Sequence, residues 1–146
     1  MTLDSEPPTL HSRRTLSLRF NVPISRTHRF WHSLKEGKFV TTRCADCGNV
    51  SFPPQADCPR CMGANAEWVD LGTEAELITY TYVQVTPTSF VNNDPYLVGI
   101  GRLNQGLKVL AWIEGTQLEK LSPGMKLRLE ARESEGAAYY VFVPAA

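Results

Sequence analysis

The sequence Cys44-Ala45-Asp46-Cys47 is followed, after ten intervening residues, by Cys58-Pro59-Arg60-Cys61, and these two motifs determine how the chain folds. It contains all 4 cysteines of the 146-residue protein. Each C-x-x-C pair can form a tight turn whose two thiolates point the same way. Gly48 gives a permissive backbone after the first pair, and Pro59 fixes φ within the second. Two such turns facing each other predict a tetrahedral cage of four sulfurs.

A closed cage of four thiolates predicts a structural metal ion. We expect zinc at Cys44, Cys47, Cys58 and Cys61, while iron, held as in rubredoxin, would use the same four ligands. Two disulfides are the alternative without metal, and the lack of a secretory signal argues against them. Because the cage leaves no coordination position for a reacting group, the site is expected to stabilise the fold and to have no catalytic role.

Composition excludes several classes of function. The 15 basic and 15 acidic residues cancel, so the whole chain has no basic character that would favour nucleic acid. No stretch approaches the roughly 18 consecutive apolar residues of a membrane helix. The first residues lack the basic and apolar regions of a secretory signal, which predicts a cytoplasmic protein. Charge is uneven, however, since residues 11–43 carry eight Arg or Lys against Glu36 alone.

Residues 1–27 are expected to form an extended N-terminal arm. After a polar beginning, apolar residues alternate with other residues from Leu16 to Ile24, which predicts a strand with one apolar face. Pro23 cannot donate a hydrogen bond to a sheet ladder, so this strand belongs at an edge. Its apolar face can pack on the protein's own barrel or on a partner subunit. The candidate partner-binding residues in the arm are Leu16, Leu18, Phe20 and Val22.

Residues 28–72 are expected to form a short helix and a zinc-ribbon domain. A helix of two to three turns before Gly37 places Phe30, Trp31 and Leu34 on one side. Two turns are unstable alone, so this side must be buried in the protein's own core or at a subunit interface. Phe30 and Trp31 are the remaining candidate partner-binding residues. Strands are predicted over 38–43, around 50–52 and over 67–71, interleaved with the two cysteine turns.

Residues 73–146 predict a barrel. Strands are expected over 75–85, 96–103, 107–113, 125–133 and 139–143, with a single helical turn over 116–121. Five strands with a helical segment between the third and the fourth are the order of an OB fold. The predicted class is therefore mainly β: an N-terminal helix, a rubredoxin-like zinc ribbon and a five-stranded OB-fold barrel.

The residues give little support for catalysis by this chain alone. No cysteine remains for nucleophilic work, and residues 73–146 contain no histidine. The second and third barrel strands offer Tyr96, Arg102, Lys108 and Trp112, so an OB-fold protein that binds single-stranded nucleic acid is an alternative. Residues 76–146 hold six basic and seven acidic residues, a balance that disfavours it.

The chain resembles the zinc-ribbon/OB-fold acyl-CoA-associated proteins over about residues 28–145. The residues that carry the resemblance are Phe30-Trp31, Glu36-Gly37-Lys38-Phe39, the two C-x-x-C pairs, Phe52-Pro53-Pro54, Glu67-Trp68, Thr79-Tyr80-Thr81, Pro95-Tyr96, Pro123-Gly124-Met125 and Phe142-Val143-Pro144-Ala145. Each motif alone is weak, and the ordered set is specific.

The resemblance implies a small, non-catalytic, zinc-binding partner of thiolase-like enzymes in a hetero-oligomer. The catalytic residues would lie on a thiolase-fold partner. In length and layout the chain is similar to the small subunit of bacterial multi-component phloroglucinol acetyltransferases, enzymes of secondary metabolism. A thiolase, a hydroxymethylglutaryl-CoA synthase or an aldolase is the alternative partner. The barrel face near Tyr80, Tyr82 and Tyr96 is expected to form part of a substrate tunnel.

Overall fold

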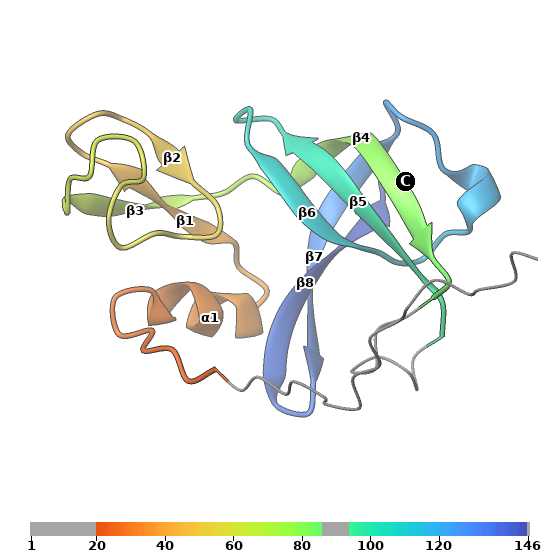
Figure 1. Ribbon diagram of the computed structural model, residues 1–146, viewed down its shortest axis with the longest axis horizontal. Helices are drawn as coiled ribbons and strands as arrows, with labels where there is room; N and C mark the ends of the chain where they lie inside the picture. Colours follow the sequence, from red (N-terminus) through yellow and green to blue (C-terminus); the bar gives the residue numbers. More distant parts are fainter. Residues whose placement is uncertain (1–19, 86–93, 146) are drawn as a thin grey trace, which may run out of the picture.

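The computed structural model describes residues 20–85 and 94–145 (Figure 1). They form one short helix, a three-stranded sheet and a five-stranded barrel, which confirms the predicted fold class. The sheet and helix lie together at one end of the molecule, with the barrel at the other. No helix within the described ranges has the length and apolar character needed to span a membrane.

The small sheet holds the cysteine turns. Strand β1 (Val40–Cys44) lies in the middle and pairs antiparallel with both β2 (Val50–Ser51) and β3 (Ala66–Asp70). Thr42 of β1 is fixed to the loop after β2, because its hydroxyl accepts a hydrogen bond from the backbone N–H of Gln55 at 2.9 Å. This sheet therefore connects both sides of the metal module to one central strand.

The barrel closes in the order β4-β5-β6-β8-β7. Its strands are β4 (Glu74–Val83), β5 (Tyr96–Leu103), β6 (Lys108–Ile113), β7 (Lys126–Ser134) and β8 (Ala137–Pro144), with a 3₁₀ turn over Leu118–Lys120. This is the predicted OB order. Alternate residues of β5 and β6 are buried, so their side chains fill the barrel while the others face outward.

Phe142 fills the middle of the barrel. Its ring is fully buried, and a Cβ placed on Gly101 of β5 would lie 2.6 Å from its Cζ. Only a glycine leaves room for the ring at this point. The pair explains why an apolar strand contains a glycine facing inward.

Helix α1 (His28–Lys35) joins the two modules. Phe30 and Leu34 are each 1% exposed, and both belong to the same core cluster as the barrel residues. The Phe30 ring lies 5.6 Å from that of Phe52 beside the ribbon and 6.3 Å from that of Tyr140 in β8. The expectation that Phe30 contacts a partner is therefore wrong, because the protein's own core buries its ring.

The N-terminal arm differs from the predicted strand. Leu16 and Leu18 lie outside the described residues. From Phe20 to Ile24 the chain is not in a strand, and Phe20 and Val22 are 82% and 69% exposed. A strand requires a neighbouring strand for its hydrogen bonds, and no described part of this chain lies in that position.

Candidate metal centre and subunit surface

The four cysteine sulfurs come together as the spacing predicted. The Sγ atoms of Cys44, Cys47, Cys58 and Cys61 all lie within 4.8 Å of one another. Two Sγ–Sγ distances, Cys44–Cys61 and Cys47–Cys58, are 3.6 Å. A tetrahedral ion with metal–sulfur bonds of about 2.3 Å needs edges of about 3.8 Å. The cage therefore fits a tetrahedral metal ion, and the cluster is a metal-binding site.

The two cysteine turns share one backbone pattern. In each turn, the first cysteine donates its N–H to the carbonyl five residues later, at 2.8 Å for both Cys44 and Cys58. Its carbonyl accepts the N–H of the fourth residue after it, Gly48 in the first turn and Met62 in the second. Gly48 has φ 73°, as expected for a glycine, and Met62 has φ 63°. Sequence reasoning missed Met62, because glycine is the residue that normally marks such a position.

The metal-free cluster does not ionise uniformly. The backbone N–H of Cys61, with that of Arg60 in addition, lowers the pKa of the Cys58 thiol from 9.0 to about 6. The backbone N–H of Gly63 lowers the pKa of Cys61, yet the neighbouring thiols of Cys44 and Cys47 outweigh it and raise the value to about 12. One thiolate thus forms readily, and a second resists until a cation offsets the crowded negative charge.

Arg26 connects the arm to the metal loop. Its guanidinium donates to the Asp57 carboxylate at 3.0 Å and to the Ala56 carbonyl at 3.0 Å, and makes a longer bond of 3.4 Å to the Ala64 carbonyl. These acceptors lie on both sides of the Cys58–Cys61 turn. The arm therefore leaves the molecule from a point fixed to the ribbon. Nothing in the sequence pattern singled out this arginine.

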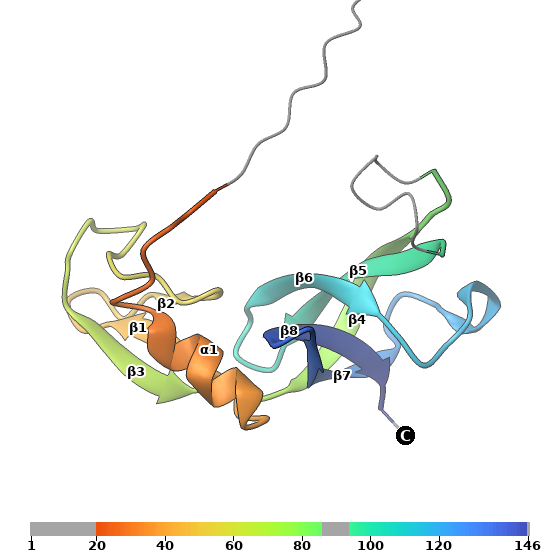
Figure 2. The same ribbon diagram turned by 90° about the horizontal axis from the view of Figure 1, so that it is seen from below.

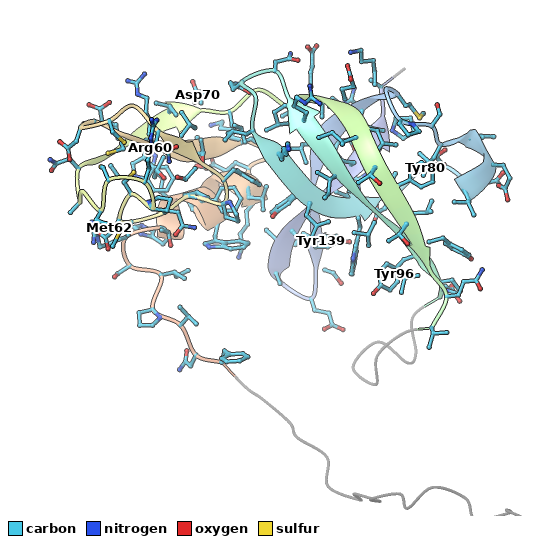
Figure 3. All side chains as sticks on the ribbon, turned by 45° about the horizontal axis from the view of Figure 1, so that its top comes forward. Arg60, Met62, Asp70, Tyr80, Tyr96 and Tyr139 are labelled. Carbon is cyan, nitrogen blue, oxygen red and sulfur yellow. The ribbon has the colours of Figure 1, made fainter. Side chains whose placement is uncertain are left out.

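The candidate partner-binding residues Phe20, Val22 and Trp31, which the structure describes, lie at the surface. Trp31 follows the buried Phe30 and is 38% exposed, with its ring 5.0 Å from that of Phe30. Phe20 and Val22 are more exposed still. In Figure 3, Met62 and Arg60 lie at the ribbon end of the molecule, and Met62 is 79% exposed.

Aromatic rings line the outer face of the barrel. The Trp112 ring of β6 lies 5.5 Å from that of Tyr96 in β5 and 6.0 Å from that of Tyr139 in β8. Tyr96 and Tyr139 lie along the same side of the barrel (Figure 3). Tyr82 and Tyr96 border a hollow there, whereas Tyr80 donates to the Leu121 carbonyl at 3.0 Å and borders neither hollow of this face. Of the three tyrosines expected on this face, the structure therefore places Tyr82 and Tyr96 there and Tyr80 elsewhere.

The two basic residues considered for nucleic-acid binding lie away from this aromatic face. Arg102 and Lys108 are paired across β5 and β6 at the end of their hairpin. Among the residues that the structure describes, those lining the two hollows of the aromatic face include Tyr96, Trp112 and Tyr139 but no Lys, Arg or His. Single-strand binding requires bases to stack where the phosphates are neutralised. This separation argues against the nucleic-acid alternative.

Two family models match the chain. Residues 31–66 match the ChsH2 rubredoxin-like zinc ribbon domain, and residues 68–132 match the ChsH2 C-terminal OB-fold domain. A DUF35 domain-containing scaffold protein of Methanocaldococcus jannaschii is 31% identical over 101 residues, covering 68% of this chain and 72% of that protein. The chain belongs to the ChsH2-type DUF35 family.

Two further relatives extend the comparison. The benzoylsuccinyl-CoA thiolase subunit BbsA of Thauera aromatica is 30% identical over 73 residues, which are 50% of this chain and 49% of that protein. The solved structure of the Ltp2-ChsH2(DUF35) aldolase contains a chain with the same fold, at a TM-score of 0.73 and 23% identity. The match covers 88% of this chain and 100% of that one.

Proposed function

We propose that this chain is a non-catalytic, metal-stapled scaffold subunit in a hetero-oligomer whose active site lies on a thiolase-like acyl-CoA enzyme. The observation that carries the proposal is the closed cage, because it uses all four cysteines of the chain. Thiolase-type chemistry requires an activated cysteine and histidine, and residues 73–146 contain neither. The partner must therefore supply both.

The names of the relatives support this class of partner. One relative is a thiolase subunit, three are named scaffold proteins, and the structural neighbour is an aldolase assembled with a DUF35 chain. On length and layout we propose the finer role of small subunit in a C-acyltransferase complex that acts on acetylated phloroglucinols. Partnership with a thiolase, a hydroxymethylglutaryl-CoA synthase or an aldolase is the alternative within the same class.

Zinc is the proposed metal. Four thiolates suit the tetrahedral preference of Zn²⁺. An ion without redox chemistry also suits a site whose proposed role is to stabilise the fold. The ion would hold β1 and the Cys58–Cys61 turn together and would supply no reacting ligand. Metal analysis of protein purified without added metal, with one equivalent of zinc expected and iron as the contrary result, tests this directly.

The arm and Trp31 are the proposed contact elements toward other subunits. Phe20 and Val22 expose apolar side chains on an anchored arm, and Trp31 adds an aromatic ring on α1. Large aromatic residues are enriched in the buried centres of protein interfaces. Leu16 and Leu18 continue the same alternating pattern in the sequence and belong to the same proposal.

Co-purification tests the proposed function. A tagged chain is co-expressed with the catalytic components of a phloroglucinol acyltransferase and, separately, with a thiolase and an acyl-CoA aldolase. We expect one enzyme to co-purify in a fixed ratio and to gain activity, while the isolated chain has none. Trp31→Asp should reduce recovery at least tenfold. Val85→Asp is the matched control, since Val85 is 91% exposed and lies outside the contact elements. Turnover by the isolated chain would overturn the proposal.

A further inference from the structure

The barrel has an opening between β6 and β8. These parallel neighbours pair only at Trp112–Val141 and Ile113–Phe142. Over the described residues, 108–111 of β6 pair with β5 alone, and 137–140 of β8 pair with β7 alone. Two strand edges thus lie beside the opening with no strand between them. Such edges accept an extended segment through main-chain hydrogen bonds.

The opening is hollow and mainly apolar. It forms a cavity of about 670 Å³ bordered by Trp31, Leu110, Trp112, Tyr139 and Tyr140, among others. Leu110 is 63% exposed, an unusual position for a leucine whose neighbours are aromatic. An extended segment with apolar side chains on one face would cover these residues.

A second hollow shares one lining residue, Trp112, with the first. The second hollow, of about 830 Å³, has three acidic residues among those that line it: Asp94, Glu114 and Glu119. Glu114 accepts a bond from Arg132 at 3.2 Å, and no ion pair is found for Asp94 or Glu119 within the described ranges. An occupant with apolar residues at one end and cationic residues toward the other is therefore complementary to the whole groove.

The N-terminal arm has this chemistry. Phe20, Val22 and Ile24 alternate and are 82%, 69% and 44% exposed. Upstream, the sequence carries Arg13, Arg14 and Arg19, with no acidic residue between His11 and Lys35. Six residues of strand span about 20 Å, so apolar and basic parts of one arm can occupy neighbouring hollows.

The exposure of the described arm residues shows that the chain's own barrel does not cover them. Arg26 also fixes the arm's base to the ribbon loop at Asp57. We propose that the arm adds as a strand to the β6–β8 opening of a second copy of this chain, so that two copies exchange arms in a closed dimer. This inference rests on the proposed role of the arm as a subunit contact, and it names the subunit. In this exchange each arm occupies the opening of the other copy, and one twofold axis relates the two contacts.

The mass of the purified full chain tests the proposal, using sedimentation velocity at several concentrations. We expect the wild type to sediment at twice its 16.3 kDa mass. Phe20→Asp in the arm and Leu110→Asp in the groove should each give monomers. Both positions are exposed, so circular dichroism and metal content should stay unchanged. Val85→Asp, equally apolar but outside the groove, should remain dimeric.

Mixing the two monomeric variants distinguishes a second copy from the chain's own barrel. The Leu110→Asp chain retains an intact arm, and the Phe20→Asp chain retains an intact opening, so the mixture should recover a dimer with one of the two contacts. An arm that folds onto its own barrel would give no recovery. A wild type that stays monomeric, or variants that dimerise as the wild type does, would overturn the inference. Purified chain suffices for this experiment, so its failure is separate from a failure of enzyme co-purification.

Discussion

At the scale of single residues, the barrel centre depends on one missing Cβ. Gly101→Ala would place a methyl group 2.6 Å from the Phe142 ring, which is fully buried. We expect a loss of about 1–3 kcal/mol in the free energy of unfolding. Gly72→Ala is the matched control, because the atoms nearest to its Cβ belong to the flexible Gln105 side chain, at 3.1 Å. Urea denaturation measures both, and equal midpoints would contradict the packing described.

The cysteines make a second prediction at this scale. The pKa of Cys58 is lowered to about 6 from 9.0, so its thiolate favours the folded metal-free protein. That stabilisation is complete above pH 9, shrinks as the pH falls and is lost below about 6. Cys61, with its pKa raised to about 12, keeps its proton at neutral pH until metal displaces it.

Metal binding should therefore release one more proton per chain at pH 5 than at pH 7.5, and bind more weakly, because Cys58 must then be deprotonated too. Titration calorimetry in buffers of different ionisation enthalpy counts these protons. A proton count that does not change across this range would show that Cys58 is not the ionised member of the cluster.

At the scale of elements, the ribbon and the helix depend on different forces. β2 has only two residues, and the Cys58–Cys61 turn is held by a few backbone bonds and Arg26. Helix α1 is instead fixed by Phe30 and Leu34 within the barrel core. Chelation should therefore raise amide exchange in residues 40–70 at least tenfold, while α1 and the barrel strands stay protected.

Hydrogen exchange with and without a chelator measures this difference, and a barrel-core substitution such as Gly101→Ala supplies the reverse case. Loss of protection throughout the molecule on chelation would contradict it. So would full protection of the ribbon without metal.

Elements with a local signal were predictable from the sequence. The cysteine spacing predicted the cage, and alternation with turn residues predicted strands at 96–103 and close to 108–113, both confirmed. Alternation alone failed for Phe20–Ile24, since it reports an apolar face and not the presence of a neighbouring strand. Phe30 was misassigned for a similar reason. Periodicity showed that one side of the helix is buried, but the residue that helps to bury it, Tyr140, lies 110 residues away in sequence.

Long-range polar contacts were beyond prediction. Arg26 is one of several arginines in a basic run, and its acceptors at Ala56, Asp57 and Ala64 become visible only when the ribbon loop is folded. No sequence pattern predicted the β6–β8 opening either, because it depends on where two strands diverge in space.

Across the described part of the chain, one set of residues stabilises the fold and a different set forms the exposed surfaces available for contact with other subunits. The metal cage, the barrel centre and α1 fix the shape, and Figure 2 shows α1 beside the small sheet with the barrel strands next to it. The arm, Trp31 and the aromatic groove carry the exposed apolar residues. Substitutions in the first set should reduce stability. Substitutions in the second set should change assembly at constant stability, which thermal unfolding and sedimentation can separate.

Phe30 wedged between Phe52 and Tyr140 has a mechanical consequence. Because one buried ring contacts both modules, we expect the ribbon and the barrel to move as one rigid unit with a constant angle between them. A partner enzyme bound to the ribbon would then be held in a constant orientation toward any molecule bound to the barrel. Phe30→Ala would remove this contact, and the orientation of the two modules, and of the proteins bound to them, would then vary.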